Sequence, residues 1–277
     1  MKKIIALVLA AVMISVASIA GTIAYLTDKD SDVNVMVLGK VDIDQREHKR
    51  DGSLFVQDQK LLPLVGDTST KDTAGYPAAE NYIDKIVTIK NEAASENAYI
   101  RTFIAVPAYS YDGQASGAFA NVLHWNGYSE GDAAPAYPAA TKVPDLTEAV
   151  DNHWWWGKKD ASAWPGNGGD WNKFTANIDG KDYEVYVVTH TTVVEPGKTT
   201  APNMIGVYLD SKVDFDGTNY TYDGKKIEGL TGNKVDVLVA TQAVQAKGWA
   251  NAWDALDGAF GEPSANNHPW IPATTTP

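Results

Sequence analysis

The side chains best able to do chemistry in this sequence are histidines, acids and tryptophans, because it contains no cysteine. Thiol nucleophiles, iron–sulfur clusters and cysteine-ligated zinc are therefore excluded. No His-Glu-x-x-His pattern supplies two zinc ligands and a general base, and no Gly-x-Ser-x-Gly turn carries a nucleophilic serine. The sequence predicts no catalytic residue, no bound metal and no cofactor. The histidines are scattered, at His48, His124, His153, His190 and His268.

Acidic residues alternate with other residues from Asp28 to Asn34, as in the first half of a calcium-binding loop. The sixth and twelfth positions of such a loop are Gly and Glu, but here they hold Val33 and Gly39. We interpret the segment as a solvated linker that keeps the start of the chain extended.

Tryptophans are concentrated in the middle of the chain, in a region rich in Gly, Pro and Ala. Exposed indole faces could form an aromatic platform that stacks on sugars, or the same rings could fill a subunit contact. The favoured interpretation is a hydrophobic plug that covers one end of a β-sandwich. The residues concerned are Trp154, Trp155, Trp156, Trp164 and Trp171.

The N-terminus has the order of features that is typical of a secretory signal peptide. Lys2 and Lys3 precede an uncharged run from Ile4 to Ala20, and a small-residue site ends at Ala24. We predict cleavage between Ala24 and Tyr25. Loss of the two lysines takes the formal net charge from -12 to -14.

This acidic balance argues against nucleic acid and anionic membrane surfaces as partners, because both are bound through Lys and Arg. No second apolar stretch has the length needed to span a bilayer. The sequence therefore predicts a secreted protein of the extracellular matrix or cell surface, with no stable membrane anchor after cleavage.

Alternating apolar residues predict strands at 81–91, 97–106, 182–195, 204–209 and 234–245. Gly-containing turns at Asp216-Gly217 and Asp223-Gly224 predict hairpins. Short helices are expected at 144–151 and 250–260. Ile205, Val207 and Leu209 are the expected core set of their strand, and Arg101 is expected to be a structural ion-pair partner.

These elements predict an all-β fold, a jelly-roll-like antiparallel β-sandwich with a loop-rich, Trp-containing insertion and a short C-terminal helix. The expected parts are a signal peptide at 1–24, an N-terminal segment at 25–43 and a domain at 44–265. The insertion occupies 107–176, and a polar C-terminal tail occupies 266–277.

Four motifs together resemble the TasA/camelysin family of secreted proteins, which a SipW-type signal peptidase processes. They are Ala-Tyr-Leu-Thr-Asp at residues 24–28, the Lys-Asn and Ala-Tyr-Ile-Arg pair within 85–101, Val-Glu-Pro-Gly-Lys-Thr-Thr at 194–200, and Ala-x-Gln-Ala-x-Gly at 243–248. The resemblance covers 1–43, 81–106 and 182–261, but not the Trp-rich middle.

The resemblance implies a jelly roll that serves as a structural subunit of a biofilm matrix fibre and is not an enzyme. It implies donor-strand complementation, in which an exposed sheet edge accepts the N-terminal strand of the next subunit. Expected partners are further copies of the chain, head to tail, related matrix or anchoring proteins, and the signal peptidase. The donor strand is expected to use Val33, Val35, Met36, Val37 and Leu38.

Two alternatives remain open at this point. One is a secreted carbohydrate-binding or cell-surface module built on the Trp-rich insertion. The other is a camelysin-like metalloprotease, although no residue motif supplies the zinc ligands and general base that such chemistry usually needs.

Overall fold

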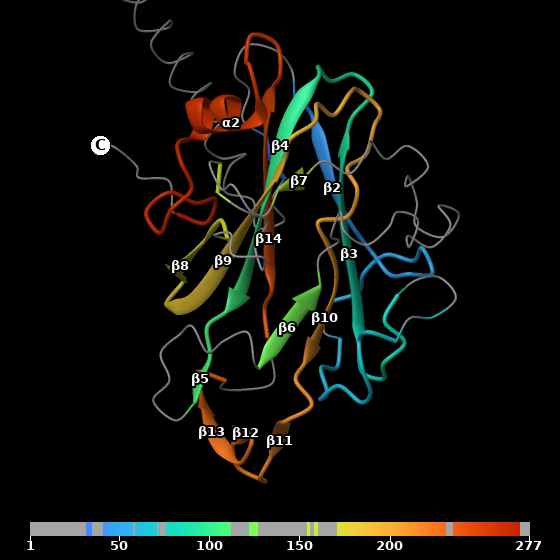
Figure 1. Ribbon diagram of the computed structural model, residues 1–277, viewed down its shortest axis with the longest axis vertical. Helices are drawn as coiled ribbons and strands as arrows, with labels where there is room; N and C mark the ends of the chain where they lie inside the picture. Colours follow the sequence, from blue (N-terminus) through green and yellow to red (C-terminus); the bar gives the residue numbers. More distant parts are fainter. Residues whose placement is uncertain are drawn as a thin grey trace, which may run out of the picture.

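The computed structural model describes residues 32–34, 41–57, 59–70, 72, 76–111, 122–126, 154–155, 158–159, 171–230 and 235–271. Two sheets face each other across an apolar core, and a smaller third sheet lies at the end of the molecule opposite the helix α2 (Figure 1). The predicted all-β sandwich with a short C-terminal helix is confirmed.

The first sheet has the order β1-β14-β4-β9-β7, and β8 also pairs with β9. All of its described pairs are antiparallel except β1 with β14. Its strands are β1 (Asp32–Asn34), β14 (Leu238–Gln245), β4 (Ala98–Pro107), β9 (Lys181–His190), β7 (Trp154–Trp155) and β8 (Lys173–Ile178).

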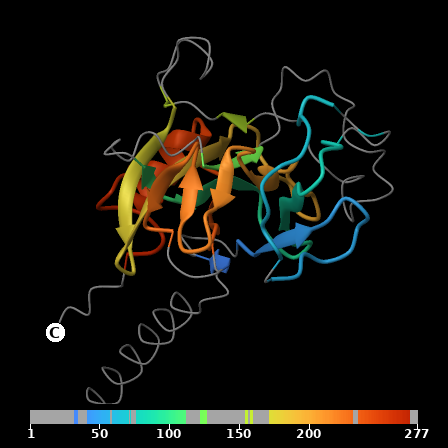
Figure 2. The same cartoon turned by 90° about the horizontal axis from the view of Figure 1, so that it is seen from below.

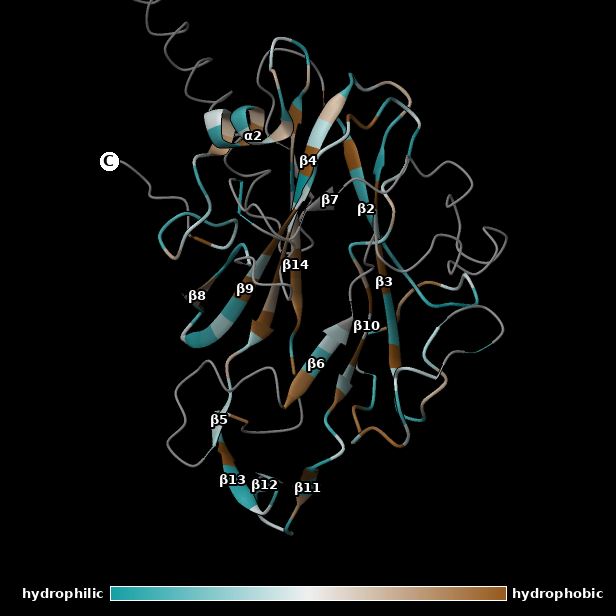
Figure 3. Cartoon of the chain, in the orientation of Figure 1, coloured by the Kyte–Doolittle hydropathy of each residue, from teal (hydrophilic) through white to brown (hydrophobic). Residues whose placement is uncertain are grey.

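The second sheet is antiparallel and has the order β2-β3-β10-β6. Hydrophobic and hydrophilic bands follow one another along β3 (Figure 3), whereas β2 has one apolar residue, Ile43, at its start. The strands are β2 (Ile43–His48), β3 (Ile83–Asn91), β10 (Met204–Leu209) and β6 (Leu123–Asn126).

The third sheet is built from hairpins with Gly-containing turns, and Figure 2 views the molecule from the end that carries it. Asp223 and Gly224 both have positive φ in the two-residue turn before β13, so the hairpin predicted there is confirmed. The sheet comprises β11 (Val213–Phe215), β12 (Tyr220–Tyr222), β13 (Lys225–Glu228) and β5 (Ser110–Tyr111).

The core between the two large sheets is lined by β-branched and long aliphatic side chains that alternate along the strands. The outer face of the first sheet is also covered. The helix α2 (Ala252–Phe260) packs against Tyr99 and Val244, and Trp270 meets Phe103 edge to face. Buried core residues include Val87, Ile89, Ile100, Ile104, Val106, Met204, Val207 and Leu209.

Three expectations change in detail. In β10 the register shifts between Met204 and Gly206, so Met204 is fully buried and the predicted core residue Ile205 is only half-buried. The expected boundary between residues 43 and 44 falls inside β2, where Ile43 is buried. The expected polar tail packs on the sheet as far as Trp270.

The insertion expected at 107–176 contributes strands to the sheets as well as loops. Its β6 joins the second sheet beside β10, and its β7 and the start of β8 border β9. The helix expected at 144–151 lies outside the described residues.

Candidate functional site

The edge of β14 that faces away from β4 is the part of the fold where the N-terminal segment meets the domain. On its inner side, β14 pairs with β4 along its whole length. On its outer side, β1 pairs in parallel with Thr241, Gln242 and Ala243. Among the described residues, the 3 of β1 pair with part of the 8-residue strand β14.

A chain of hydrogen bonds crosses the sandwich and ends at the same edge. His190 Nε2 meets Asn203 Oδ1 at 2.9 Å, and Asn203 Nδ2 donates to Thr102 Oγ1 at 2.6 Å. The hydroxyls of Thr102 and Thr241 lie 3.3 Å apart, and Thr241 donates to Gln45 Oε1 at 2.9 Å. Three members, Thr102, Asn203 and Thr241, are fully buried. The network therefore fixes the position of β14 relative to β2 along the direction of the strands.

The donors of this network run in one direction. The single hydroxyl proton of Thr241 is used on Gln45, so the Thr102 hydroxyl must donate to Thr241. Asn203 Oδ1 can only accept, so His190 Nε2 carries a proton. At the far end Gln45 Nε2 donates to the Val239 carbonyl of β14 at 3.5 Å. A carbonyl of the β14 edge is thus occupied by a side chain of the second sheet.

His190 is held in its neutral form inside this network. Burial lowers its pKa to about 4, and the hydrogen bond with Asn203 opposes the shift only in part. His190 as a whole residue is 2% exposed, and it lies in β9 beside the short strand β7. A neutral imidazole here acts as a structural hydrogen-bond donor.

The other face of β14 is fixed to α2 by Arg101, as the sequence predicted for a structural ion-pair residue. Its side chain is 3% exposed and contacts Asp257 at 2.7 Å. It also donates to Gln242 Oε1 at 2.7 Å and to the Gly261 carbonyl at 2.9 Å. Burial lowers the pKa of Arg101 to about 10, with Asp257 opposing the shift. We call these three contacts of Arg101 the Arg101 clamp. Because Gln242 also pairs with Val33, the clamp holds a residue of β14 that β1 meets.

The helix is placed by its own termini. The Asn251 side chain caps its start by accepting from the Asp254 backbone N–H at 2.9 Å. At its end, Gly261 has a positive φ of 79° and its N–H donates to the Asp257 carbonyl. These caps bring both Asp257 and the Gly261 carbonyl to Arg101.

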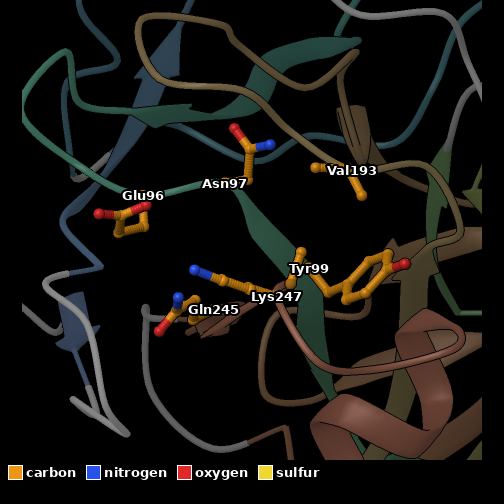
Figure 4. A pocket seen from close by; sticks show the side chains of 7 residues that line it. Glu96, Asn97, Tyr99, Val193, Gln245 and Lys247 are labelled. Carbon is orange, nitrogen blue, oxygen red and sulfur yellow. The ribbon is translucent and has the colours of Figure 1, made fainter.

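A cleft of about 420 Å³ opens at the C-terminal end of β14 (Figure 4). It lies just beyond the last residue that β1 contacts, Ala243. Buried Tyr99 and half-buried Val193 form an apolar wall of the cleft, while charged and amide side chains surround its opening. The lining residues are Glu96, Asn97, Tyr99, Val193, Gln245, Ala246 and Lys247.

Most of the N-terminal residues named from the sequence fall outside the described residues. These are Ala24 and Tyr25 at the expected cleavage point, and Val35, Met36, Val37 and Leu38 of the expected donor strand. Val33 lies in β1 and pairs with Gln242.

The expected tryptophan platform is only partly described. Trp154 and Trp155 form β7 and pair with His190 and Thr189 of β9, whereas Trp156 and Trp164 lie outside the described residues. Trp171 is 37% exposed and meets Tyr186 edge to face, with ring centroids 5.9 Å apart.

A further tryptophan joins this group. Trp125 of β6 meets the same Tyr186 ring at 5.1 Å. Tyr186 donates to Glu184 at 3.0 Å, and Lys173 pairs with Glu184. An aromatic group with a carboxylate at its side therefore lies where β6, β8 and β9 meet.

Within the described ranges, no three His or acidic residues come together as metal ligands. Of the histidines there, His124 contacts Asp210 at 3.0 Å, and His48, His190 and His268 are buried. Also within these ranges, no helix is both long enough and apolar enough to cross a membrane.

Comparisons with known proteins leave the site to be judged on its own geometry. No protein-family model matches the chain, and no curated protein matches it.

Proposed function

We propose that this protein is a secreted structural subunit of an extracellular biofilm matrix fibre that assembles by N-terminal donor-strand complementation. One observation supports this most strongly. The segment that follows the expected signal peptide pairs with the open edge of β14, and it does so in parallel in an otherwise antiparallel sheet. The strand is therefore an addition to the edge and not a neighbour joined to it by a hairpin.

The edge of β14 suits an incoming strand because unpaired backbone groups of an edge strand are a template for another chain. Three paired residues make a weak attachment by themselves, so the edge can exchange its partner. Burying each valine of the N-terminal segment contributes about 1.5–3 kcal/mol, from which the cost of association must be subtracted.

Exchange of this strand between copies produces an open chain of subunits. Each copy offers one N-terminal segment and one β14 edge, which are different surfaces. A contact between different surfaces continues into a filament unless the rotation between copies closes a ring. Cleavage after Ala24 would release the segment for this exchange.

Negative-stain electron microscopy of the mature chain, beginning at Tyr25, tests the proposal. We expect filaments from this chain and folded monomers from a chain that lacks residues 25–38. Equal polymerisation of both chains would refute donor-strand assembly. Val35→Asp should also stop assembly, since it brings an unpaired charge into a half-buried strand. The matched control Ser31→Asp adds the same charge ahead of the valines and should leave filaments intact.

A second candidate function, carbohydrate binding, is favoured by the aromatic group around Trp171. An indole that is 37% exposed beside Tyr186 and the Glu184 carboxylate offers a stacking face and a hydrogen-bond acceptor. In this case Trp171→Ala would abolish retention on cell-wall glycan while the melting temperature stays unchanged. Absence of retention by the intact mature protein would eliminate this candidate.

A further inference from the structure

The cleft at the C-terminal end of β14 brings together four polar side chains that have no hydrogen-bond or ion-pair partner among the described residues. Two of them are charged, Glu96 and Lys247, and two are amides, Asn97 and Gln245. Glu96 and Asn97 lie along one side of the cleft, and Gln245 and Lys247 lie along the other (Figure 4). A carboxylate and an ammonium group therefore border the same space without pairing with each other.

The backbone on the Glu96 side is held in place by hydrogen bonds that do not use these side chains. The fully buried Asn91 side chain donates to the Glu96 carbonyl at 2.9 Å. The Asn97 carbonyl accepts from the Ala246 N–H at 2.7 Å, which ties this side of the cleft to the end of β14. Glu96 and Asn97 are thus presented by a backbone that is already fixed, which lowers the cost of binding a ligand.

Lys247 is placed by a tight turn directly after β14. The Trp249 N–H donates to the Ala246 carbonyl at 3.2 Å, which closes a four-residue turn. Gly248 is the third residue of this turn and has a φ of 93°, as a type II turn requires. The turn therefore fixes the backbone of Lys247 at the opening of the cleft.

The surface between the two charged groups is apolar. Tyr99 and Ala246 are 8% and 9% exposed, and both belong to the buried group that packs against α2. Half-buried Val193 packs against the same group. The volume of about 420 Å³ lies in the range of small-ligand sites. From the end of β14 the cleft extends across β4 to Val193, and so away from the edge that β1 meets.

A ligand that matches this arrangement carries an ammonium group, a carboxylate and an apolar side chain. Glu96 pairs with the ammonium group and Lys247 with the carboxylate, through charge-assisted hydrogen bonds. Asn97 and Gln245 each offer an amide donor and acceptor, which a peptide group between the two charged ends can use. An uncharged sugar or an inorganic phosphate would leave at least one of the two charges without a partner.

We propose that this cleft binds a short peptide with both termini unblocked, of dipeptide size and with an apolar side chain. The N-terminal ammonium group lies against Glu96, the C-terminal carboxylate lies against Lys247, and the apolar side chain contacts Tyr99 and Val193. This binding site goes beyond the fibre function and does not rest on it.

Titration of the mature chain, beginning at Tyr25, with leucyl-alanine tests the proposal, and saturation-transfer difference NMR measures the Kd. Three related probes are titrated in parallel. N-acetyl-leucyl-alanine has no ammonium group, leucyl-alanine amide has no carboxylate, and leucine alone has no peptide group. We expect saturable binding of the dipeptide and at least about tenfold weaker binding of each blocked form, the effect of losing one hydrogen bond to a charged group.

Two variants assign each terminus to its side chain. Glu96→Gln should no longer distinguish the dipeptide from its N-acetyl form, but should still distinguish it from its amide. Lys247→Met should show the reverse pattern. A general loss of structure would not produce this exchange of preferences. The matched control Lys226→Met removes an exposed lysine from the third sheet, at the opposite end of the molecule, and should leave all affinities unchanged.

Several results would overturn the site. These are an absence of saturable binding by the intact mature chain, equal binding of the dipeptide and its two blocked forms, and a Lys226→Met variant that loses as much affinity as Lys247→Met. Equal binding of leucine alone would overturn the assignment to a peptide, because one residue would then make every contact. Filament formation is observed separately by electron microscopy, so failure of this site and failure of the fibre proposal are distinguishable.

Discussion

The two edges of the first sheet are completed in different ways. At one edge, β8 precedes β9 in a hairpin, and the turn between Ile178 and Lys181 consists of Asp179 and Gly180. Both turn residues have positive φ, 51° and 82°, as in the two-residue turns that match strand twist. At the other edge, β14 receives three residues from the opposite end of the chain.

This difference separates a permanent edge from an exchangeable one. A two-residue turn keeps β8 beside β9 at every moment, so no other copy competes for that position. A strand from the far end of the chain must close a long loop, which adds an entropic cost. An identical strand from another copy makes the same contacts, which is the basis of strand exchange. The β14 edge is therefore where we expect assembly.

The largest expected effect on the free energy of unfolding comes from removing the buried ion pair of Arg101. Arg101→Met should lower the free energy of unfolding by about 3–5 kcal/mol, because it removes a buried charge partner of Asp257 and a bond to Gln242. The matched change in the hairpin, Lys181→Met, should cost about 1 kcal/mol or less, since the side chains of Lys181 and its partner Asp236 are 64% and 52% exposed. Urea unfolding measures both, and equal losses would contradict the comparison.

A pH-dependent loss of stability is expected from His190, which lies in the network that ends at the β14 edge. Its folded pKa of about 4 is below its ordinary value of 6.5, so the unfolded chain takes up the proton first. The contribution of His190 is complete above pH 6.5 and is lost as the pH falls toward 4. By pH 5 the loss should be about 2 kcal/mol.

Urea unfolding at pH 7.5 and pH 5 measures this loss, and His190→Gln is the matched variant. The glutamine amide can still donate to Asn203 but does not titrate. Carboxylates titrate equally in both proteins, so the difference between them isolates His190. Identical pH dependence in the two proteins would refute the assignment.

An effect smaller than those of Arg101 and His190 is expected at the turn of the hairpin edge. Gly180→Ala should destabilise by about 1–2 kcal/mol, because its φ of 82° lies in the left-handed region that a Cβ disfavours. No neighbouring atom lies within 4 Å of the added Cβ, so strain in the backbone is the only cause. Gly180→Asn should be milder, since Asn tolerates this conformation better. Filament formation should be unchanged in both, and loss of filaments would show that this edge also takes part in assembly.

The sequence predicted local features well. Alternation located β3, β4, β9 and β10, and the helix expected at 250–260 is present as α2. The Asp179-Gly180 pair was an available signal for β8 that the strand assignment missed. The core set of β10 was wrong at Ile205 because a register shift, which alternation does not reveal, brings Met204 inward.

Long-range features were not predictable in the same way. The network joins residues from β2, β4, β9 and β14 with Asn203, and the sequence analysis predicted no contact between them. Gln45 stood in a polar stretch with nothing to mark its contact with Val239. The resemblance suggested a donor strand, but only the structure identifies β14 as the edge it meets within its own chain.

The most direct test of the central claim is complementation in trans. A labelled peptide of residues 25–38 is titrated into the mature protein that lacks those residues, and binding is followed by fluorescence anisotropy. We expect a folded truncated protein that binds one peptide saturably, with binding lost for the Val35→Asp peptide. A folded truncated protein that does not bind the peptide would contradict the claim. So would a truncated protein that fails to fold, because the strand would then be a fixed part of its own sheet.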